Sequence, residues 1–207
     1  MDHRRMIAAI AFAAGSCGAL AVASAQPSQP STSLLDASLI TEIRDFLDSP
    51  VVWKSVKAQN ARTASYDQAK IDEMDQLWVA QRKSDDQPLI ASVLTSPLSV
   101  YLTRIQAANL GLYTEMFVMD GKGLNVGQSA TTSDYWQGDE AKYQKTFLVA
   151  PDAVFIDEAE YDDERGIWRA QVNLTLTAPD GATPIGAATI EVNLTELERR
   201  RALGLGF

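Results

Sequence analysis

The sequence is poor in the side chains that most enzymes use for acid–base and metal chemistry. Its 207 residues contain one histidine, His3, and one cysteine, Cys17, and both lie within the first 25 residues. Histidine is the usual general base near neutral pH, and zinc and copper sites draw on imidazole and thiolate groups. If the first 25 residues are removed, Ser-His-Asp hydrolysis, Cys-His hydrolysis and conventional zinc sites are nearly excluded. Chemistry of carboxylates, lysine and tyrosine remains, as does hard-cation binding by oxygen ligands.

Positive charge is also scarce. The chain has 18 Lys and Arg residues against 27 Asp and Glu residues, which gives a formal net charge of -9. Most of the affinity for nucleic acid comes from cationic neutralisation of phosphates, so nucleic acid is a poor candidate partner. The sequence contains no internal repeat and no Gly-rich phosphate loop. A composition of 46% hydrophobic and 22% charged residues is that of one ordinary globular domain.

The first 25 residues have the pattern of an export signal. Arg4 and Arg5 supply a positive start, residues 6–22 form an Ala-rich apolar stretch, and the small residues 23–25 form a cleavage pattern. We therefore expect a cleavable signal peptide over residues 1–25 and a periplasmic protein. Two alternatives stay open, an uncleaved anchor helix and lipidation at Cys17.

A polar Pro/Ser linker is expected over residues 26–33, and a single domain over 34–207. The first part of that domain, residues 34–110, has apolar residues at helical spacing. Proline interrupts the pattern at three places, Pro50, Pro88 and Pro97. Helical regions are therefore expected over 34–60, 66–82 and 85–109, the second capped by Asp67.

The pattern changes to strands after Gly111. The sequence predicts a hairpin of strands 113–119 and 124–129, a polar aromatic loop over 131–138, a short helix over 139–146 and three further strands, 153–161, 167–177 and 185–194. Turn residues join the last three strands into an antiparallel meander. This order predicts an α+β fold in which the N-terminal helices pack on one face of a five-stranded antiparallel sheet.

Three segments resemble the extracytoplasmic Cache (PDC, PAS-like) sensor family. They are Phe-Val-Met-Asp-Gly-Lys-Gly at 117–123, Thr-Ser-Asp-Tyr-Trp-Gln-Gly-Asp-Glu-Ala-Lys at 132–142 and Pro-Ile-Gly-Ala-Ala-Thr-Ile at 184–190. They resemble, in order, the family's V-x-D-x-x-G hairpin, its pocket loop with Asp, Tyr and Trp, and its closing strand. The resemblance covers about residues 34–195. It implies a PAS-like sheet whose pocket binds a small molecule, often an amino acid, a carboxylate or an amine.

The sequence also departs from that family. Cache domains usually lie between two transmembrane helices and pass a signal to a cytoplasmic kinase, cyclase or chemotaxis module. Here the sequence stops at Phe207 after a short helical tail over 195–201. We therefore expect a freestanding single-Cache form that needs a membrane partner for any output.

The loop carrying Asp134, Tyr135 and Trp136 offers a carboxylate, a phenol and an indole in succession. A pocket for a small polar ligand needs a few placed polar groups among apolar and aromatic walls. The two rings are candidates for a wall against a methylene or cationic group, and Asp134 for pairing with an ammonium. Lys142 and Lys145 follow on the short helix and are candidates to face a ligand carboxylate. The alternative is that Trp136 packs in the core and both lysines are solvated.

Asp120 and the acidic run over 157–164 are two further candidate features. Asp120 in the hairpin turn is expected to form the turn through its side chain. The acidic run over 157–164 suggests a hard cation but lacks the spacing and glycine of an EF-hand loop, so we expect solvated side chains. Asp157 is the member expected to point inward, and it joins the candidate ligand-binding residues. We expect no metal and no cofactor.

The function predicted from these observations is a non-catalytic, periplasmic, small-molecule-binding sensor-type domain. Its expected ligand is an amino acid, an amine or an organic acid, and its expected protein partners are a membrane-bound receptor or kinase and a second copy of the chain, paired through the N-terminal helix. The alternative is an envelope protein–protein interaction module with a vestigial pocket. An enzyme is the weakest hypothesis, because its general base would have to be a carboxylate with a raised pKa.

Overall fold

The computed structural model describes residues 27–205, so the predicted signal segment, with His3 and Cys17, lies outside the described residues. In that part of the chain the helical elements are η1 (Thr32–Leu34), α1 (Ala37–Leu47), α2 (Pro50–Thr63), α3 (Gln68–Gln81), α4 (Pro88–Leu94), α5 (Pro97–Ala108), α6 (Ala141–Gln144) and α7 (Leu194–Ala202). The strands are β1 (Tyr113–Asp120), β2 (Asn125–Gln128), β3 (Val154–Ile156), β4 (Glu160–Asp162), β5 (Ile167–Thr177) and β6 (Pro184–Asn193).

The three prolines each begin a helix. Pro50, Pro88 and Pro97 occupy the first helical position of α2, α4 and α5, where the missing N–H has no partner to lose. Asp67 caps α3 by accepting a hydrogen bond from the Lys70 backbone N–H at 2.9 Å. The predicted restart at Pro50 and the predicted cap at Asp67 are therefore confirmed. Between α1 and α2, Asp48 leaves the helical conformation with φ of -77° and ψ of 59°.

The sheet is antiparallel throughout, with strand order β2-β1-β6-β5-β3, and β4 also pairs with β5. The α+β prediction is confirmed, but the single strand predicted over 153–161 is wrong. It is two strands, β3 and β4, separated by residues 157–159, where the Asp157 side chain accepts a hydrogen bond from the Glu158 N–H at 2.9 Å. The long β5 pairs with both pieces, with β3 along its middle at 172–174 and with β4 along its start at 167–169.

The two faces of the sheet differ in chemistry. One face packs against α1, α2 and α5 and is apolar, with fully buried residues such as Val118, Val172 and Ile190. Side chains alternate between faces along a strand. The neighbours of these residues therefore point to the other face, and many of them are polar, for example Asn173, whose Oδ1 accepts a hydrogen bond from the Thr189 hydroxyl at 2.8 Å.

The polar face is covered by the segment that connects β2 to β3, which includes α6. Tyr143 and Phe147 of this segment stack at 5.2 Å between ring centroids and pack with Phe117, Met119 and Ala187 of the sheet. The Tyr143 hydroxyl donates a hydrogen bond to the Gly121 carbonyl at 2.7 Å, which ties the cover to the hairpin turn. One side of the sheet is thus a helix-packed core, and the other is a polar surface with a partial cover.

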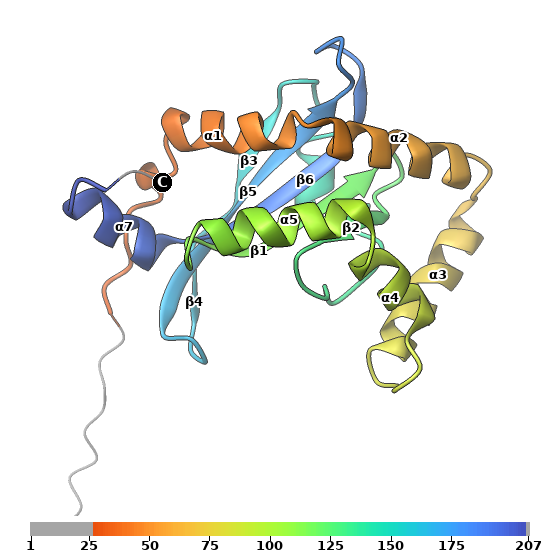
Figure 1. Cartoon of the computed structure of the whole chain (residues 1–207), viewed down its shortest axis with the longest axis horizontal. Helices are drawn as coiled ribbons and strands as arrows, with labels where there is room; N and C mark the ends of the chain where they lie inside the picture. Colours follow the sequence, from red (N-terminus) through yellow and green to blue (C-terminus); the bar gives the residue numbers. More distant parts are fainter. Residues whose placement is uncertain (1–26, 206–207) are drawn as a thin grey trace, which may run out of the picture.

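The remaining helices lie at the two ends of the sheet (Figure 1). Helices α3 and α4 pack beyond the β1–β2 hairpin around Trp78. At the opposite end α7 meets the start of α1, where Arg201 and Asp36 form an ion pair of 2.8 Å. Among residues 27–205 no single helix has the length and hydropathy for a membrane span, although the pair α4 and α5, bent by 60° between them, passes that test when taken together.

Candidate functional site

The loop that carries Asp134, Tyr135 and Trp136 is fastened to α3. One carboxylate oxygen of Asp75 accepts hydrogen bonds from the backbone N–H groups of Tyr135 at 2.8 Å and Trp136 at 2.9 Å. The Asp134 carbonyl accepts a further bond from the Thr132 hydroxyl at 2.7 Å. The half-buried Asp134 carboxylate accepts a bond from the neighbouring Ser133 hydroxyl at 2.7 Å. The loop is thus held by buried polar contacts on both sides.

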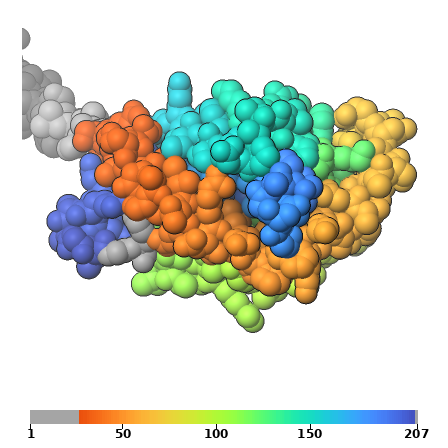
Figure 2. Space-filling model, turned by 90° about the horizontal axis from the view of Figure 1, so that it is seen from above, coloured from red at the N-terminus to blue at the C-terminus, as the bar shows by residue number. Residues whose placement is uncertain are grey.

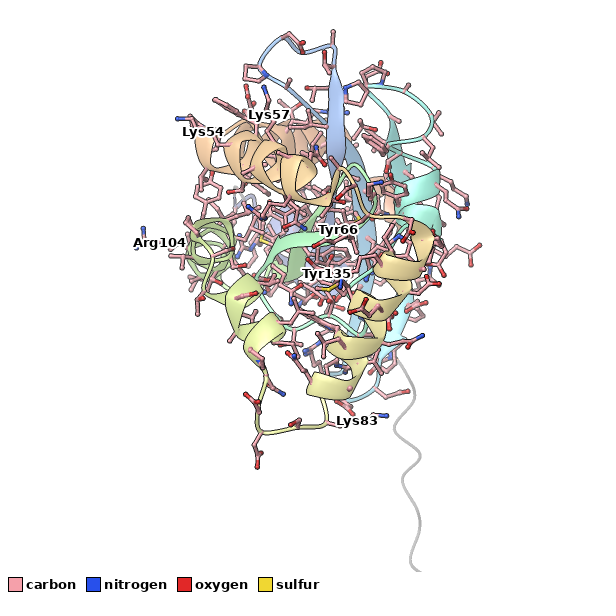
Figure 3. All side chains as sticks on the ribbon, turned by 90° about the vertical axis from the view of Figure 1, so that its right-hand side faces the viewer. Lys54, Lys57, Tyr66, Lys83, Arg104 and Tyr135 are labelled. Carbon is pink, nitrogen blue, oxygen red and sulfur yellow. The ribbon has the colours of Figure 1, made fainter. Side chains whose placement is uncertain are left out.

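The two aromatic rings of this loop fill the space between α3 and the hairpin. Tyr135 is 6% exposed and stacks on Trp78 with 5.4 Å between ring centroids, inside the molecule (Figure 3). Burial raises the pKa of the Tyr135 hydroxyl to about 12. The Trp136 indole N–H donates to the Lys122 carbonyl at 2.9 Å. Both rings therefore take part in packing under the loop, and their role against a ligand stays a prediction.

The hairpin turn beside this loop has the geometry expected of Asp120. Its carboxylate accepts hydrogen bonds from the backbone N–H groups of Lys122 at 2.8 Å and Leu124 at 3.0 Å, so the predicted turn-forming role is confirmed. Gly123 closes the turn with φ of +82°, and a Cβ there would lie 2.6 Å from the Gly138 Cα. The turn and the loop therefore approach backbone to backbone.

Lys142 and Asp157 line a cavity on the polar face of the sheet. We call it the polar recess, and its volume is about 190 Å³. It lies where the cover segment meets β5 and β6. Its lining residues are Glu140, Lys142, Asp157, Glu158, Glu160, Arg169, Ala170, Gln171 and Glu191. Lys145 is placed differently, because its Nζ lies 4.2 Å from the centroid of the Phe155 ring and the side chain is exposed. Of the six predicted ligand residues, Asp134, Tyr135 and Trp136 therefore lie in the loop, Lys142 and Asp157 line the polar recess, and Lys145 belongs to neither group.

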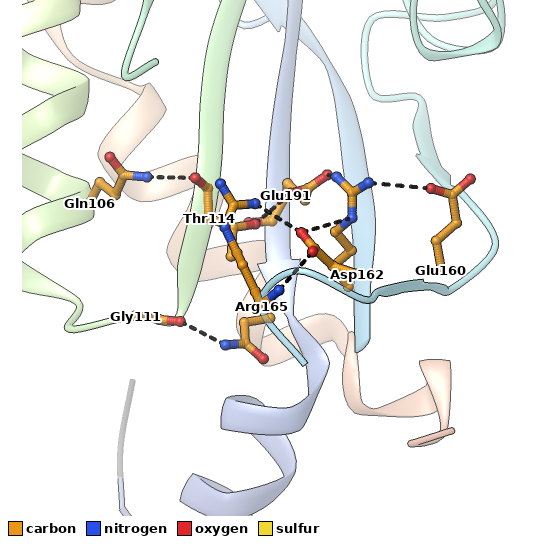
Figure 4. A network of polar contacts seen from close by, with 9 residues as sticks. Gln106, Gly111, Thr114, Glu160, Asp162, Arg165 and Glu191 are labelled. Carbon is orange, nitrogen blue, oxygen red and sulfur yellow. Dashed lines mark hydrogen bonds and ion pairs between the residues drawn. The ribbon is translucent and has the colours of Figure 1, made fainter. Parts of the chain in front are cut away.

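Arg169 is the centre of charge in the polar recess. Figure 4 labels two of the carboxylates with which it forms ion pairs, Glu160 and Glu191. Its guanidinium lies 2.6 Å from the Glu191 carboxylate and 3.7 Å from that of Glu160. Lys142 supplies the second cation, with its Nζ 2.9 Å from Glu140 and 5.4 Å from the centroid of the Phe117 ring. Both cationic side chains are thus paired with carboxylates and remain partly accessible. A ligand carboxylate could therefore replace one of these ion pairs.

Two carboxylates stand opposite each other beside the polar recess. Glu115 of β1 is the register partner of Glu191 of β6, so their side chains share one face at cross-strand distance. Glu191 is neutralised by Arg169 and also accepts a bond from the Thr114 hydroxyl at 2.6 Å. Burial, followed by the charge of Glu191, raises the pKa of the Glu115 carboxyl, although Lys142 and Arg169 act in the opposite direction.

The substitution Glu115→Gln is expected to stabilise the protein at neutral pH. The pKa of the Glu115 carboxyl is higher in the folded protein than its ordinary value of 4.5. The group therefore lowers the free energy of unfolding as the pH rises from 4.5 through the folded pKa. Glutamine removes this loss together with the repulsion from Glu191, a gain of up to about 1 kcal/mol at pH 7 that disappears below pH 4.5. Urea denaturation at a series of pH values measures it, with the exposed Glu164→Gln as control. A variant less stable than wild type at pH 7 would contradict the assigned electrostatics.

Sequence reasoning missed Arg169, Glu191 and Glu115 as site residues. They belong to β5, β6 and β1, and only strand register brings them together. A signal was present in the sequence, because polar residues alternate with apolar ones along β5 and the end of β6, which marks one polar face. Within residues 27–205 no group of three or more His, Cys, Asp or Glu side chains has the arrangement of a metal site.

The fold and the polar recess describe an α+β domain with one apolar helix-packed face and one polar, partly covered face. No protein-family model matches the chain, and neither does any curated protein. Similar solved structures include the ligand-binding domain of an amino-acid chemoreceptor of Pseudomonas aeruginosa in complex with GABA, with a TM-score of 0.40 and 13% identity over 78% of this chain and 62% of that chain.

Two further structures are the ligand-binding domain of a Campylobacter jejuni chemoreceptor in complex with L-valine and the sensor domain of a V. cholerae histidine kinase. The first has a TM-score of 0.37 and 12% identity over 81% of this chain and 64% of that chain. The second has a TM-score of 0.36 and 12% identity over 78% and 58%. These neighbours are ligand-binding or sensor domains of chemoreceptors and of a histidine kinase. The chain spans about three fifths of the length of each.

Proposed function

We propose that this chain is a non-catalytic sensor-type domain that binds a small polar molecule in the polar recess. The observation that carries the proposal is the recess itself, a cavity of about 190 Å³ with two cations and several carboxylates on the polar face of the sheet. Sites for drug-sized ligands have volumes of roughly 300–1,000 Å³, so the recess fits a smaller metabolite. We place the domain in the periplasm, where occupancy of the recess would be passed to a membrane-bound receptor or kinase.

The charges of the recess favour a ligand that carries an ammonium group, with or without a carboxylate. Asp157 and Glu191 offer carboxylates to an ammonium, and Lys142 offers an ammonium to a carboxylate. Lys142 is already paired with Glu140 at 2.9 Å, and a ligand carboxylate would compete for it. An amino acid satisfies both signs of charge, and an amine satisfies the carboxylates. Asp134, Tyr135 and Trp136 remain the second proposed group, which a ligand would reach only by displacing the packing under the loop.

A thermal-shift screen of amino acids, amines and organic acids tests the proposal. A ligand at 100 times its dissociation constant should stabilise the folded protein by about 2.7 kcal/mol. Lys142→Gln and Asp157→Asn should weaken the shift, whereas Lys83→Gln, at an exposed lysine in the turn after α3, should leave it unchanged (Figure 3). Trp136→Phe separates the two proposed groups, because it changes a ring of the loop and no residue of the recess.

Two outcomes of the screen would contradict the proposal. If no compound in a broad panel stabilises the protein, the proposed sensor function is contradicted. A stabilising compound whose shift depends on Trp136 and is unaffected by the two recess variants would move the site to the loop.

A second candidate function, an envelope interaction module, is favoured by one observation. Leu148 and Val149, four and five residues after the end of α6, are 62% and 67% exposed. Adjacent exposed aliphatic side chains of this kind are frequent in protein contacts. Crosslinking from position 148 that recovers one stoichiometric membrane protein, together with an inactive ligand screen, is the result expected of that module.

A further inference from the structure

A second cavity lies on the opposite side of the sheet from the polar recess, and we call it the hairpin cavity. Its volume is about 210 Å³. It lies between the junction of α1 with α2 and the tip of the β5–β6 hairpin, whose blue tip lies against the orange helices in Figure 2. Residues on both sides of the junction line the cavity, where α1 ends at Leu47 and α2 begins at Pro50.

The floor of the hairpin cavity is apolar. Leu47 and Val52 contribute from the two helices, and Leu174, Leu176 and Ile185 from the two strands. The roof is the hairpin tip, in which the Asp180 carboxylate accepts hydrogen bonds from the Thr183 N–H at 2.9 Å and the Thr183 hydroxyl at 2.6 Å. The tip contributes Ala178, Pro179 and Gly181 to the lining. The walls therefore fit a small aliphatic or aromatic group.

The rim of the hairpin cavity is polar and has groups free to bind. Arg44 donates from one guanidinium nitrogen to the Asp152 carbonyl at 2.9 Å, which anchors the side chain and leaves its other donors. Trp53 forms part of the wall, and within residues 27–205 its indole N–H has no hydrogen-bond acceptor, unlike those of Trp78, Trp136 and Trp168. A guanidinium and an indole N–H are both donors that suit a carboxylate.

The charges around the rim also favour a negatively charged ligand group. Helix α2 contains Lys54, Lys57 and Arg62 and no acidic residue, in a chain whose net charge is -9. Lys54 lies 5.3 Å from the centroid of the Trp53 ring, and Lys57 projects from the same helix (Figure 3). The hydrogen bonds from Thr183 and Ala182, followed by the charge of Lys57, lower the pKa of Asp180 to about 2. Asp48 is the one acidic residue among those that line the cavity.

We propose that the hairpin cavity is a second ligand site, which takes a small apolar group bearing one carboxylate. The apolar group fills the floor between the helix junction and the strands, and the carboxylate meets Arg44 and the indole N–H of Trp53 at the rim. An occupant would contact helices α1 and α2, which the polar recess does not touch, and also β5 and β6, which line both cavities. The site is independent of the ligand of the polar recess.

Titration of 15N-labelled protein with 3-phenylpropionate tests the inference. Each of the four tryptophans gives its own indole N–H signal, and Trp53→Phe identifies the relevant one. The Trp53 signal is expected to shift and saturate, while the signals of Trp78, Trp136 and Trp168, which donate to backbone carbonyls, serve as internal controls. The amine 3-phenylpropylamine, with the same ring and the opposite charge, should bind at least about tenfold more weakly.

Three variants complete the test. Arg44→Gln should weaken binding of 3-phenylpropionate by about tenfold, whereas Arg104→Gln on α5, the same change on an exposed residue that does not line the cavity, should leave it unchanged. Asp48→Asn should strengthen binding, because it removes the negative charge at the rim. The inference is overturned if the Trp53 signal does not shift by about 10 mM probe, if the amine binds equally well, or if Asp48→Asn weakens binding.

Discussion

Trp78→Ala is expected to cause the largest loss of stability among single substitutions at the candidate site, about 3–5 kcal/mol. The side chain is fully buried, stacks on Tyr135 at 5.4 Å between centroids and donates a hydrogen bond to the Thr132 carbonyl at 3.1 Å. Alanine removes the ring from the centre of the cluster that joins α3, α4 and the loop, and it leaves that carbonyl without its donor. Urea denaturation followed by circular dichroism measures the change.

Leu77→Ala is the matched control for this prediction. Leu77 is the preceding residue of α3 and is 43% exposed, so its truncation leaves no closed cavity. Its expected cost is under about 1 kcal/mol. Similar losses for the two variants would show that the loop is not anchored on Trp78, and would reopen the space under Tyr135 to a ligand.

Asp120→Ala is expected to destabilise the protein by about 3 kcal/mol. The carboxylate is fully buried and accepts bonds from the N–H groups of Lys122 and Leu124 and from the Thr63 hydroxyl at 2.9 Å. Each buried donor left without an acceptor costs about 1–3 kcal/mol. The total is reduced because burial itself disfavours the charged carboxylate, which is why the pKa of Asp120 is raised. Urea denaturation at pH 7 gives the value.

Asp180→Ala provides the comparison within the same chain. Asp180 holds the β5–β6 hairpin tip with the same kind of side-chain to backbone bonds, at 3.0 Å to the Ala182 N–H and 2.9 Å to the Thr183 N–H, but in full contact with water. Water replaces the lost acceptor there, so the loss should be much smaller than at Asp120. Equal losses would mean that turn formation, and not burial, sets the cost at both positions.

Features of the fold that depend on neighbouring residues could be predicted from the sequence. Pro50, Pro88 and Pro97 begin helices because a proline at the first helical position gives up no hydrogen bond, and Asp120 and Asp67 act within four residues of their own position. The split of the predicted strand 153–161 could not be foreseen, since it depends on how the distant β5 pairs with each half.

The candidate site was predicted only in part for the same reason. Lys142 lies in the predicted short helix and Asp157 in the predicted strand 153–161, and the structure brings both to the polar recess. Arg169 and Glu191 complete that recess through a register between β5 and β6 that no local pattern specifies. Tyr135 and Trp136 were selected for their chemistry, whereas their position depends on Asp75 of α3, some 60 residues earlier.

The ion pair between Asp36 and Arg201, at 2.8 Å, brings the beginning of α1 to the end of α7 at one corner of the molecule. Residues near these two positions can therefore be linked by a short peptide, and new ends can be opened in the exposed turn at residues 163–165. Such a circular permutant keeps every strand pairing of the sheet and places its new ends near the polar recess. A fluorescent reporter attached there would sense that recess directly.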